Sequence, residues 1–292
     1  MTHRIAAVSF LNSWPLVDAL AGRDDVQLVT DVPSQLSELL HEDRADVALI
    51  PVIEWFRGAG SAIVPGVALA TGGPVDSVKL FASVPPPEIR HVAVDRGSRT
   101  SVALLRVLFA ELWGVEPDFK VAEPQVNSLL DEADAALVIG DRCFAAEKRF
   151  RDEGLLGGAG VHEIDLGETW RQMTGLPFVF AVWVVGDGFA LRSDAAEREA
   201  LTWLLQDAKA VGLARIDALA DRAVAEGRLG PGGSRSREAI IHYFRESMCY
   251  DLGARELAGL QRFHRLCVKH RIIPDGRGVD PAVLIGLEGT SR

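Results

Sequence analysis

Short apolar runs alternate with amphipathic segments along the first half of the chain, a pattern typical of a parallel α/β sheet. It predicts strands at residues 4–10, 26–30 and 47–50 and helices at residues 15–20 and 33–41. A second series follows the prolines at 85–87 and predicts strands at 91–95, 119–122 and 135–139 and helices at 100–113 and 127–132. We therefore expect two α/β units in succession.

The two units share a repeated segment. Residues 43–50 (DRADVALI) correspond to residues 131–138 (DEADAALV) at an offset of 131 − 43 = 88. The same offset places Asn12 on Thr100. Chance similarity between two βαβ units explains this match as well as common design does, but the order of elements still favours two lobes built alike.

The second half of the chain is mostly helical. An apolar segment at residues 175–185 predicts one more strand, and helices are predicted at 194–226, 234–248 and 253–270, with a glycine-rich break at 227–233. A helical block of this size is expected to pack back on the first unit. The chain would then cross between the units twice, near residues 78–83 and 178–184.

These elements predict an α/β protein with two lobes. We assign residues 1–82 and 180–292 to a discontinuous first lobe that includes the C-terminal helices, and residues 83–179 to the second lobe. Ligands of such sheets bind outside the carboxyl ends of the strands, so we expect a ligand cleft between the lobes.

Composition narrows the class of protein. The chain has 292 residues, enough to bury a sizeable core, and its net charge of −10 argues against a general nucleic-acid binder. Cys143, Cys249 and Cys267 are too far apart in sequence to suggest a metal site or a disulfide framework, and free thiols fit a reducing cytoplasm. The sequence shows no signal-peptide pattern and no apolar run of about 18 residues, so we expect a cytoplasmic protein without a membrane span.

The loop at residues 95–101 is the strongest candidate for chemistry, because it follows a predicted strand and opens a predicted helix. Free N–H groups at a helix start favour a carboxylate or a phosphate. Ser98, Thr100 and Ser101 add hydroxyl groups and Arg99 adds a cation. The same serines and threonine are also preferred helix caps, so an anion site and a plain capping segment both fit the local sequence.

Other loops carry weaker signals. Asn12, in the loop at residues 9–15, could orient a ligand through its amide or cap the next helix. The glycines in the segment 71–77 permit close approach to a ligand or mark a simple turn. Asp141 ends a predicted strand and is most easily explained as a cap. The sequence contains no GxSxG, Walker or HExxH motif, which removes most support for hydrolase, kinase and metalloenzyme functions.

Five motifs taken together, in this order, are more specific than any one of them: SFLNSWPL (9–16), GPVDS (73–77), SRTSV (98–102), ADAALVIGD (133–141) and TGLPFVFAVW (174–183). This combination resembles the chorismate dehydratases of the futalosine route to menaquinone, over roughly residues 4 to 270. The resemblance implies a fold similar to that of type II periplasmic binding proteins. It also implies a hydro-lyase that converts chorismate into 3-[(1-carboxyvinyl)oxy]benzoate without a cofactor or a metal.

The resemblance also implies roles for individual residues. Asn12 matches the family's active-site asparagine, Ser77 matches a serine that faces the substrate, and Thr100 and Ser101 match a loop that binds a substrate carboxylate.

From the same motifs we expect Ser98, Arg99, Gly140 and Asp141 to contribute to binding of the small dianionic substrate. No histidine lies in these motifs. We therefore expect the substrate's own enolpyruvyl carboxylate to take the proton.

Three other functions remain open at this stage. The sister naphthoate synthase of the same pathway shares the fold, but its chemistry relies on a histidine that these motifs do not supply. A solute-binding protein of a transporter would need a leader or lipobox, which the sequence does not show. A ligand-sensing regulatory domain would usually be joined to a helix-turn-helix partner.

Overall fold

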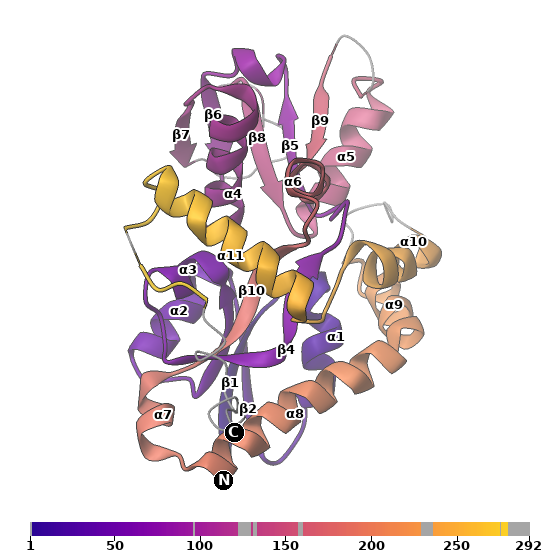
Figure 1. Cartoon of the computed structure of the whole chain (residues 1–292). Helices are drawn as coiled ribbons and strands as arrows, with labels where there is room; N and C mark the ends of the chain where they lie inside the picture. The colour runs from indigo at the N-terminus through magenta and orange to yellow at the C-terminus, as the bar shows by residue number, and fades with distance from the viewer. Residues whose placement is uncertain are drawn as a thin grey trace.

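The computed structural model describes residues 2–95, 97–121, 130, 133–156, 160–228, 236–274 and 276–279. The chain forms two lobes, each built around a five-stranded sheet (Figure 1). The strand order is β2-β1-β3-β10-β4 in the first lobe and β7-β6-β8-β5-β9 in the second. The α/β fold with two lobes that the sequence predicts is therefore confirmed.

The first lobe combines parallel and antiparallel strands. Strand β1 runs parallel to β2 and β3, whereas β10 runs antiparallel to β3 and β4. Its strands are β1 (His3–Val8), β2 (Val26–Asp31), β3 (Val47–Pro51), β4 (Ala62–Thr71) and β10 (Phe178–Val185). Its helices are α1 (Trp14–Val17), α2 (Pro33–His41), α3 (Val52–Phe56), α7 (Asp187–Arg192), α8 (Ala195–Ala214), α9 (Ile216–Ala225), α10 (Arg237–His242) and α11 (Ala254–Lys269).

The second lobe repeats this arrangement. Strand β6 runs parallel to β7 and β8, and β5 runs antiparallel to β8 and β9. Its strands are β5 (Val78–Ala82), β6 (His91–Val94), β7 (Asp118–Val121), β8 (Ala135–Ile139) and β9 (His162–Asp165), and its helices are α4 (Thr100–Leu108), α5 (Arg142–Asp152) and α6 (Leu166–Thr174). Two π-helical turns, η4 (Phe109–Trp113) and η6 (Tyr243–Ser247), extend α4 and α10.

The repeated segment has the same structural role in both lobes. It leads into β3 in one lobe and into β8 in the other, and each of these strands pairs in parallel with the first strand of a βαβ unit. The aspartate just before each strand accepts a backbone hydrogen bond from that neighbour. Asp46 accepts from the N–H of Arg4 at 2.8 Å, and Asp134 accepts from the N–H of His91 at 2.9 Å. The two sheets are therefore built alike, down to this contact.

The structure moves both predicted lobe boundaries. Strand β5 pairs with β8 and β9, so it belongs to the second sheet and not to a first lobe that ends at residue 82. The chain therefore crosses between the lobes at residues 72–77, which we call the crossover loop. All five positions of β5 are buried, and a fully buried strand carries no alternation that shows which sheet it joins. The predicted boundary at residue 180 similarly falls inside β10.

The helix predictions need smaller corrections. The segment predicted as one helix at 194–226 is divided into α8 and α9 near Arg215. The helix predicted at 127–132 lies outside the described residues, apart from residue 130. Within the part of the chain that is described, no helix is both long enough and apolar enough to cross a bilayer.

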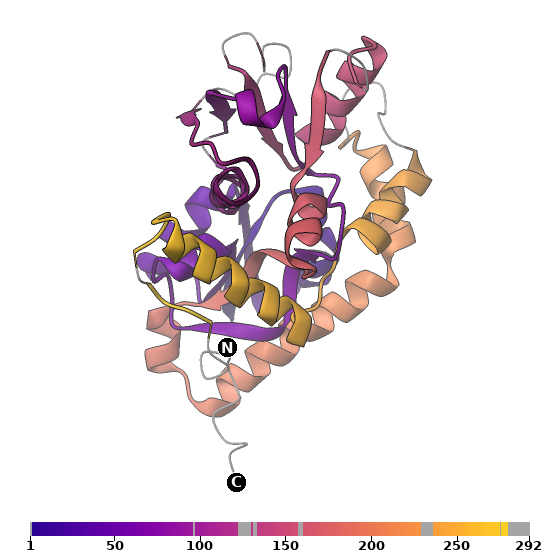
Figure 2. The ribbon, with the colours of Figure 1, turned by 45° about the horizontal axis from the view of Figure 1, so that its top comes forward.

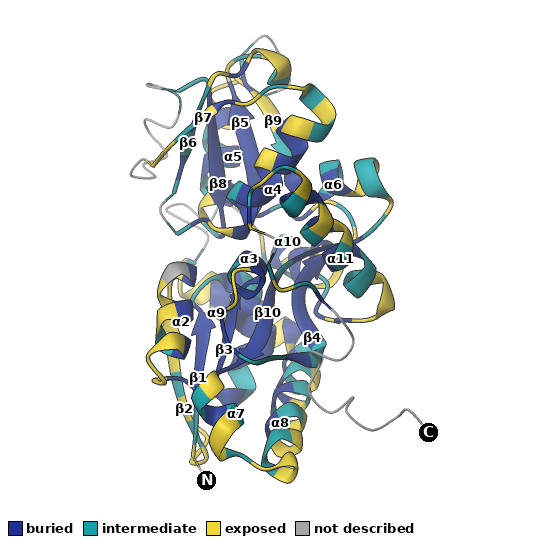
Figure 3. Cartoon of the chain, turned by 60° about the vertical axis from the view of Figure 1, so that its left-hand side comes forward, coloured by how far each residue is buried: buried dark blue, intermediate teal, exposed yellow. Residues whose placement is uncertain are grey.

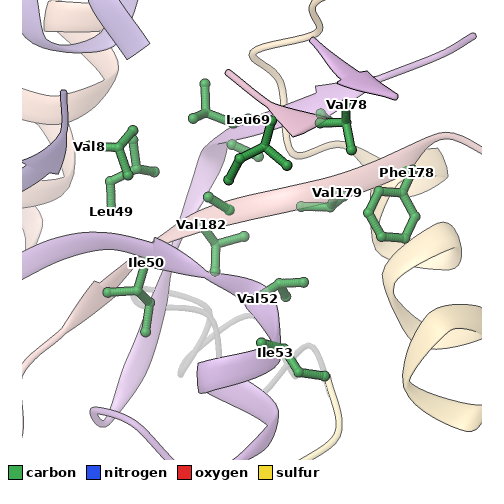
Figure 4. Packing of buried hydrophobic residues seen from close by; sticks show 14 of the residues in the cluster. Val8, Leu49, Ile50, Val52, Ile53, Leu69, Val78, Phe178, Val179 and Val182 are labelled. Carbon is green, nitrogen blue, oxygen red and sulfur yellow. The ribbon is translucent and has the colours of Figure 1, made fainter. Parts of the chain in front are cut away.

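The C-terminal helices return to the first lobe, as expected. Helices α8, α9 and α10 follow its outer side, and α11 lies across the sheet and reaches α4 of the second lobe (Figures 1 and 2). Buried positions follow the inner strands of both sheets, whereas the edge strands β2, β7 and β9 and the outer helices carry exposed positions (Figure 3). Side chains of β3, β10 and α3, such as Ile50, Val182 and Ile53, pack together in the core of the first lobe (Figure 4).

Candidate active site

A pocket that opens to solvent lies between the two lobes, where β1, β3 and β8 end. This is the edge of an α/β sheet at which ligands bind. Most of its wall is apolar: Val8, Phe10, Pro33, Pro51, Leu69, Phe180 and Ala181 from the first lobe, Val78 and Ile139 from the second, and Val75 from the crossover loop. The polar lining is small and comes from both lobes, so a ligand here would contact both of them.

Asn12 brings an amide to this pocket from the turn that follows β1. Ser13 shapes this turn, because its hydroxyl donates to the carbonyl oxygens of Val8 at 2.7 Å and Phe10 at 2.8 Å. The Oδ1 atom of Asn12 is buried and has no hydrogen-bond partner among the described residues. A buried amide oxygen without a partner is costly, which favours a role in binding a ligand over the alternative of a helix cap.

Thr100 and Ser101 line the pocket from the first turn of α4. Both are buried, at 4% and 6% exposure, and the positive end of the helix dipole lies beside them. The Thr100 Oγ1 atom also accepts a long hydrogen bond of 3.4 Å from the N–H of Ile53, in the first lobe. This arrangement favours an anionic group in the pocket. Ser98 is buried next to this turn without lining the pocket.

Arg99 is the one charged residue among the described residues that line the pocket. Its side chain is 42% exposed, and its Nε atom lies 4.0 Å from Oε1 of Glu54, so it sits at the edge of the pocket where it opens to solvent. Glu54 itself forms a closer pair with Arg57, at 2.8 Å. The guanidinium of Arg99 is therefore available to a carboxylate that enters from solvent.

Ser77 lines the pocket from the end of the crossover loop. The half-buried carboxylate of Asp165 holds this loop, because it accepts hydrogen bonds from the N–H groups of Val75 and Asp76 at 3.0 Å and 2.8 Å. Burial raises the pKa of Asp165, although these N–H groups act in the opposite direction. The Oγ atom of Ser77 lies 2.8 Å from the hydroxyl oxygen of Tyr243, which comes from the C-terminal helices.

Gly140 lines the pocket and Asp141 does not. Gly140 has a φ of +65°, and a Cβ atom there would lie 2.8 Å from the ring of Phe10, across the cleft. Asp141 instead joins the lobes: its carboxylate accepts a 3.0 Å hydrogen bond from the N–H of Leu11 and lies 3.2 Å from the guanidinium of Arg228. Burial raises the pKa of Asp141. Asp141 therefore forms a contact between the lobes, and its direct contact with substrate stays a prediction.

The structure thus brings together Asn12, Ser77, Arg99, Thr100, Ser101 and Gly140, and leaves Ser98 and Asp141 just outside the pocket. Sequence reasoning missed the apolar walls, although Phe10 and Phe180 lie inside the quoted motifs. It also missed Tyr243, for which the sequence offers no local signal.

Two lobes with an intervening ligand pocket define the class of periplasmic-binding-protein folds, and solved structures agree. The aliphatic sulphonate binding protein SsuA of Escherichia coli superposes with a TM-score of 0.62 at 16% identity, covering 97% of this chain and 91% of that one. A Candida albicans protein described as having the generic periplasmic binding protein fold gives a TM-score of 0.61 at 14% identity, covering 95% and 92% of the two chains. A protein of Archaeoglobus fulgidus gives 0.68 at 14% identity, covering 93% and 98%.

Sequence comparison narrows this class to one family. Residues 3–269 match the model of the menaquinone biosynthesis family, and the chain belongs to that family. A chorismate dehydratase from Thermus thermophilus is 33% identical over 198 residues, which are 65% of this chain and 70% of the relative.

Proposed function

We propose that this protein is an enzyme of menaquinone biosynthesis that removes water from chorismate to give 3-[(1-carboxyvinyl)oxy]benzoate, a hydro-lyase reaction. The observation that carries the proposal is the pocket between the lobes, in a chain of the menaquinone biosynthesis family with a chorismate dehydratase as a relative. Its polar lining contains hydroxyl, amide and guanidinium donors and, among the described lining residues, no carboxylate. Such a lining suits a small dicarboxylate such as chorismate.

The proposed binding mode uses the polar groups of both lobes. Thr100 and Ser101, at the start of α4, would hold one substrate carboxylate with backbone N–H groups and hydroxyls. Arg99 would complete the charge balance at the mouth of the pocket. Asn12 and Ser77 would face the other end of the substrate, and Gly140 leaves room for the ring. Asp141 would support this site from outside it by holding Leu11, and Ser98 lies buried beside the first turn of α4.

The reaction follows from the chemistry of chorismate. The proton to be removed is vinylogous to the ring carboxylate, so its loss moves negative charge onto that carboxylate. Donors fixed at the start of α4 would stabilise this charge as it forms. The neighbouring hydroxyl then leaves with the C–O electron pair, and the ring becomes aromatic, which supplies the driving force.

The base is the substrate itself in this proposal. The described residues that line the pocket include no histidine, aspartate or glutamate, and Asp141 is engaged with Leu11 and Arg228. The enolpyruvyl carboxylate therefore takes the ring proton and passes it to the departing hydroxide, which forms water. Asn12 would orient the carboxylate or the leaving hydroxyl through its otherwise unpartnered amide. Closure of the lobes would keep solvent out during these steps.

The test is incubation of the purified protein with chorismate. Loss of chorismate with formation of an aromatic enolpyruvyl ether and one equivalent of water supports the proposal. Tight binding without turnover would instead favour a non-catalytic binding protein for small anions, the function that the sulphonate-binding neighbour has by name. Formation of a naphthoate from a later intermediate would favour the sister synthase. We place the reaction in the cytoplasm, where free thiols such as Cys143 and Cys267 stay reduced.

A further inference from the structure

We propose that Tyr243 is a positioning residue for the pocket: its hydroxyl donates to Ser77 and thereby directs the Ser77 proton towards a carboxylate of the ligand. This inference rests on the proposed function, because it assigns how the same site recognises its substrate. Tyr243 does not line the pocket, so it would act through Ser77 and not on the ligand directly.

The contact between the two hydroxyls is short and fully enclosed. The Tyr243 oxygen lies 2.8 Å from Ser77 Oγ, and the two residues are 1% and 0% exposed. The Tyr243 ring packs against Phe144, whose ring centroid lies 5.1 Å away in a T-shaped contact. Tyr243 therefore has little freedom to turn its hydroxyl elsewhere.

The donor and acceptor capacity of a serine hydroxyl determines where the Ser77 proton points. A serine hydroxyl has one proton to donate and two lone pairs to accept with. Tyr243 uses one lone pair, so the proton must find an acceptor on another side. Within the protein that acceptor is the carbonyl of Val75, at a long 3.3 Å, which a ligand carboxylate would replace with a shorter, charge-assisted bond. Burial raises the pKa of Tyr243, so its hydroxyl keeps its proton and remains a donor.

A second bond from the same turn provides an internal comparison. Ser247, one turn after Tyr243 in η6, donates its hydroxyl to Asp76 at 2.7 Å, on the same crossover loop. Both bonds tie η6 to this loop, but only the Tyr243 bond ends on a hydroxyl that lines the pocket. Loss of the Ser247 bond therefore measures how much the site depends on the attachment of η6 to the crossover loop, while the Tyr243 hydroxyl still directs the Ser77 proton.

The experiment is a double-mutant cycle on Ser77→Ala and Tyr243→Phe, with Ser247→Ala and Tyr250→Phe as controls. Tyr250 is a matched control because its hydroxyl is also buried but has no hydrogen-bond partner among the described residues. Two quantities are measured: kcat/KM for chorismate, and the Kd of 3-(carboxymethoxy)benzoate, a dicarboxylate that cannot lose water, by calorimetry.

We expect Tyr243→Phe and Ser77→Ala each to lower kcat/KM and raise Kd by about tenfold, the loss of roughly one charge-assisted hydrogen bond. The double variant should be no worse than Ser77→Ala alone, because Tyr243 acts through Ser77. Both controls should stay within about twofold of the wild type.

The inference is wrong if Tyr243→Phe retains wild-type values, if its effect multiplies with that of Ser77→Ala, or if Ser247→Ala causes the same loss. The two proposals fail in different ways. A wild-type protein that binds the dicarboxylate but leaves chorismate intact refutes the proposed function, while the binding cycle still decides the role of Tyr243. A wild-type protein that neither binds the dicarboxylate nor uses chorismate refutes both.

Discussion

Replacement of Gly140 by alanine tests whether the cleft works by closing on its ligand. Gly140 has a φ of +65°, which costs an alanine about 1 kcal/mol. The new Cβ would also lie 2.8 Å from Cδ1 of Phe10, closer than real contacts allow, and 3.0 Å from Cε1, which is tighter than most. Displacing a packed ring of this kind costs about 1–3 kcal/mol. The first cost applies to the folded protein whether the lobes are apart or together, and the second applies only when the lobes are together.

The steric cost therefore opposes closure more than folding. Gly140 follows β8 in the second lobe, and Phe10 follows β1 in the first, so separation of the lobes relieves the contact. A penalty of about 1–3 kcal/mol on the closed form should weaken ligand binding by about 5- to 150-fold, at 1.4 kcal/mol for each factor of ten. The assay is KM for chorismate together with the Kd of a non-reacting dicarboxylate. Thermal unfolding measures the cost to the fold separately.

Gly154 provides the matched control. It lies in the same lobe and has nearly the same φ, +68°, but a Cβ there would meet no atom within 4 Å. Gly154→Ala should lower the melting temperature by a similar amount and leave KM and Kd unchanged. Equal binding by the two variants would refute the idea that Phe10 and Gly140 meet when the site closes on its ligand.

Three further predictions follow from single contacts. Asn12→Ala should abolish turnover with an unchanged melting temperature, and normal turnover in this variant would exclude a catalytic role for the Asn12 amide. Asn12→Asp should also weaken chorismate binding, because it adds a negative charge beside a dianion. Asp165→Asn should cost about 2 kcal/mol in denaturant unfolding, because an amide cannot accept from all three N–H groups that its carboxylate binds. Lys79→Met should cost ~3 kcal/mol at pH 7, because it removes the cation that Glu163 and Glu147 share and leaves Glu147 with Arg151 alone. Burial alone would lower the pKa of Lys79, but Glu163 and Glu147 raise it above 10.5. The stabilisation of the wild type by Lys79 should therefore fade as the pH rises through this raised pKa. The melting temperature of Lys79→Met should accordingly depend less on pH in the alkaline range.

The sequence predicts most of the fold because hydrophobic periodicity and turn chemistry are local. Buried strands such as Val47–Pro51 and Ala135–Ile139 stand out as short apolar runs, and both are found where they are expected. Sheet membership is not local, which explains the misplaced boundary at residue 82. Strand β5 is as apolar as the strands of the first lobe, and only its pairing with β8 and β9 assigns it to the second.

The site is predictable to the same extent. Asn12, Thr100 and Ser101 belong to loops that join a strand to a helix, and such loops are recognisable in the sequence. Tyr243 and Ser77 are separated by 166 positions, so no spacing or motif could connect them. For Asp141, the local sequence identifies the residue but not its partner. Its position at the end of a strand suggested a cap or a ligand contact, but its partner is a backbone N–H of the other lobe.

Local groups, and not net charge, explain how an acidic chain can hold a dianion. A net charge of −10 would repel such a ligand if it acted as one field, but in physiological salt charges are screened over about 8 Å. Within that distance the described lining contributes Arg99, the start of α4 and several hydroxyls. Just outside the lining, the carboxylate of Asp141 is committed to Leu11 and to Arg228, and the carboxylate of Glu54 pairs with Arg57. The contacts of Asp141 with Leu11 and Arg228 join the lobes and also keep the Asp141 carboxylate away from the substrate. Closure of the lobes and recognition of an anion therefore depend on the same residues.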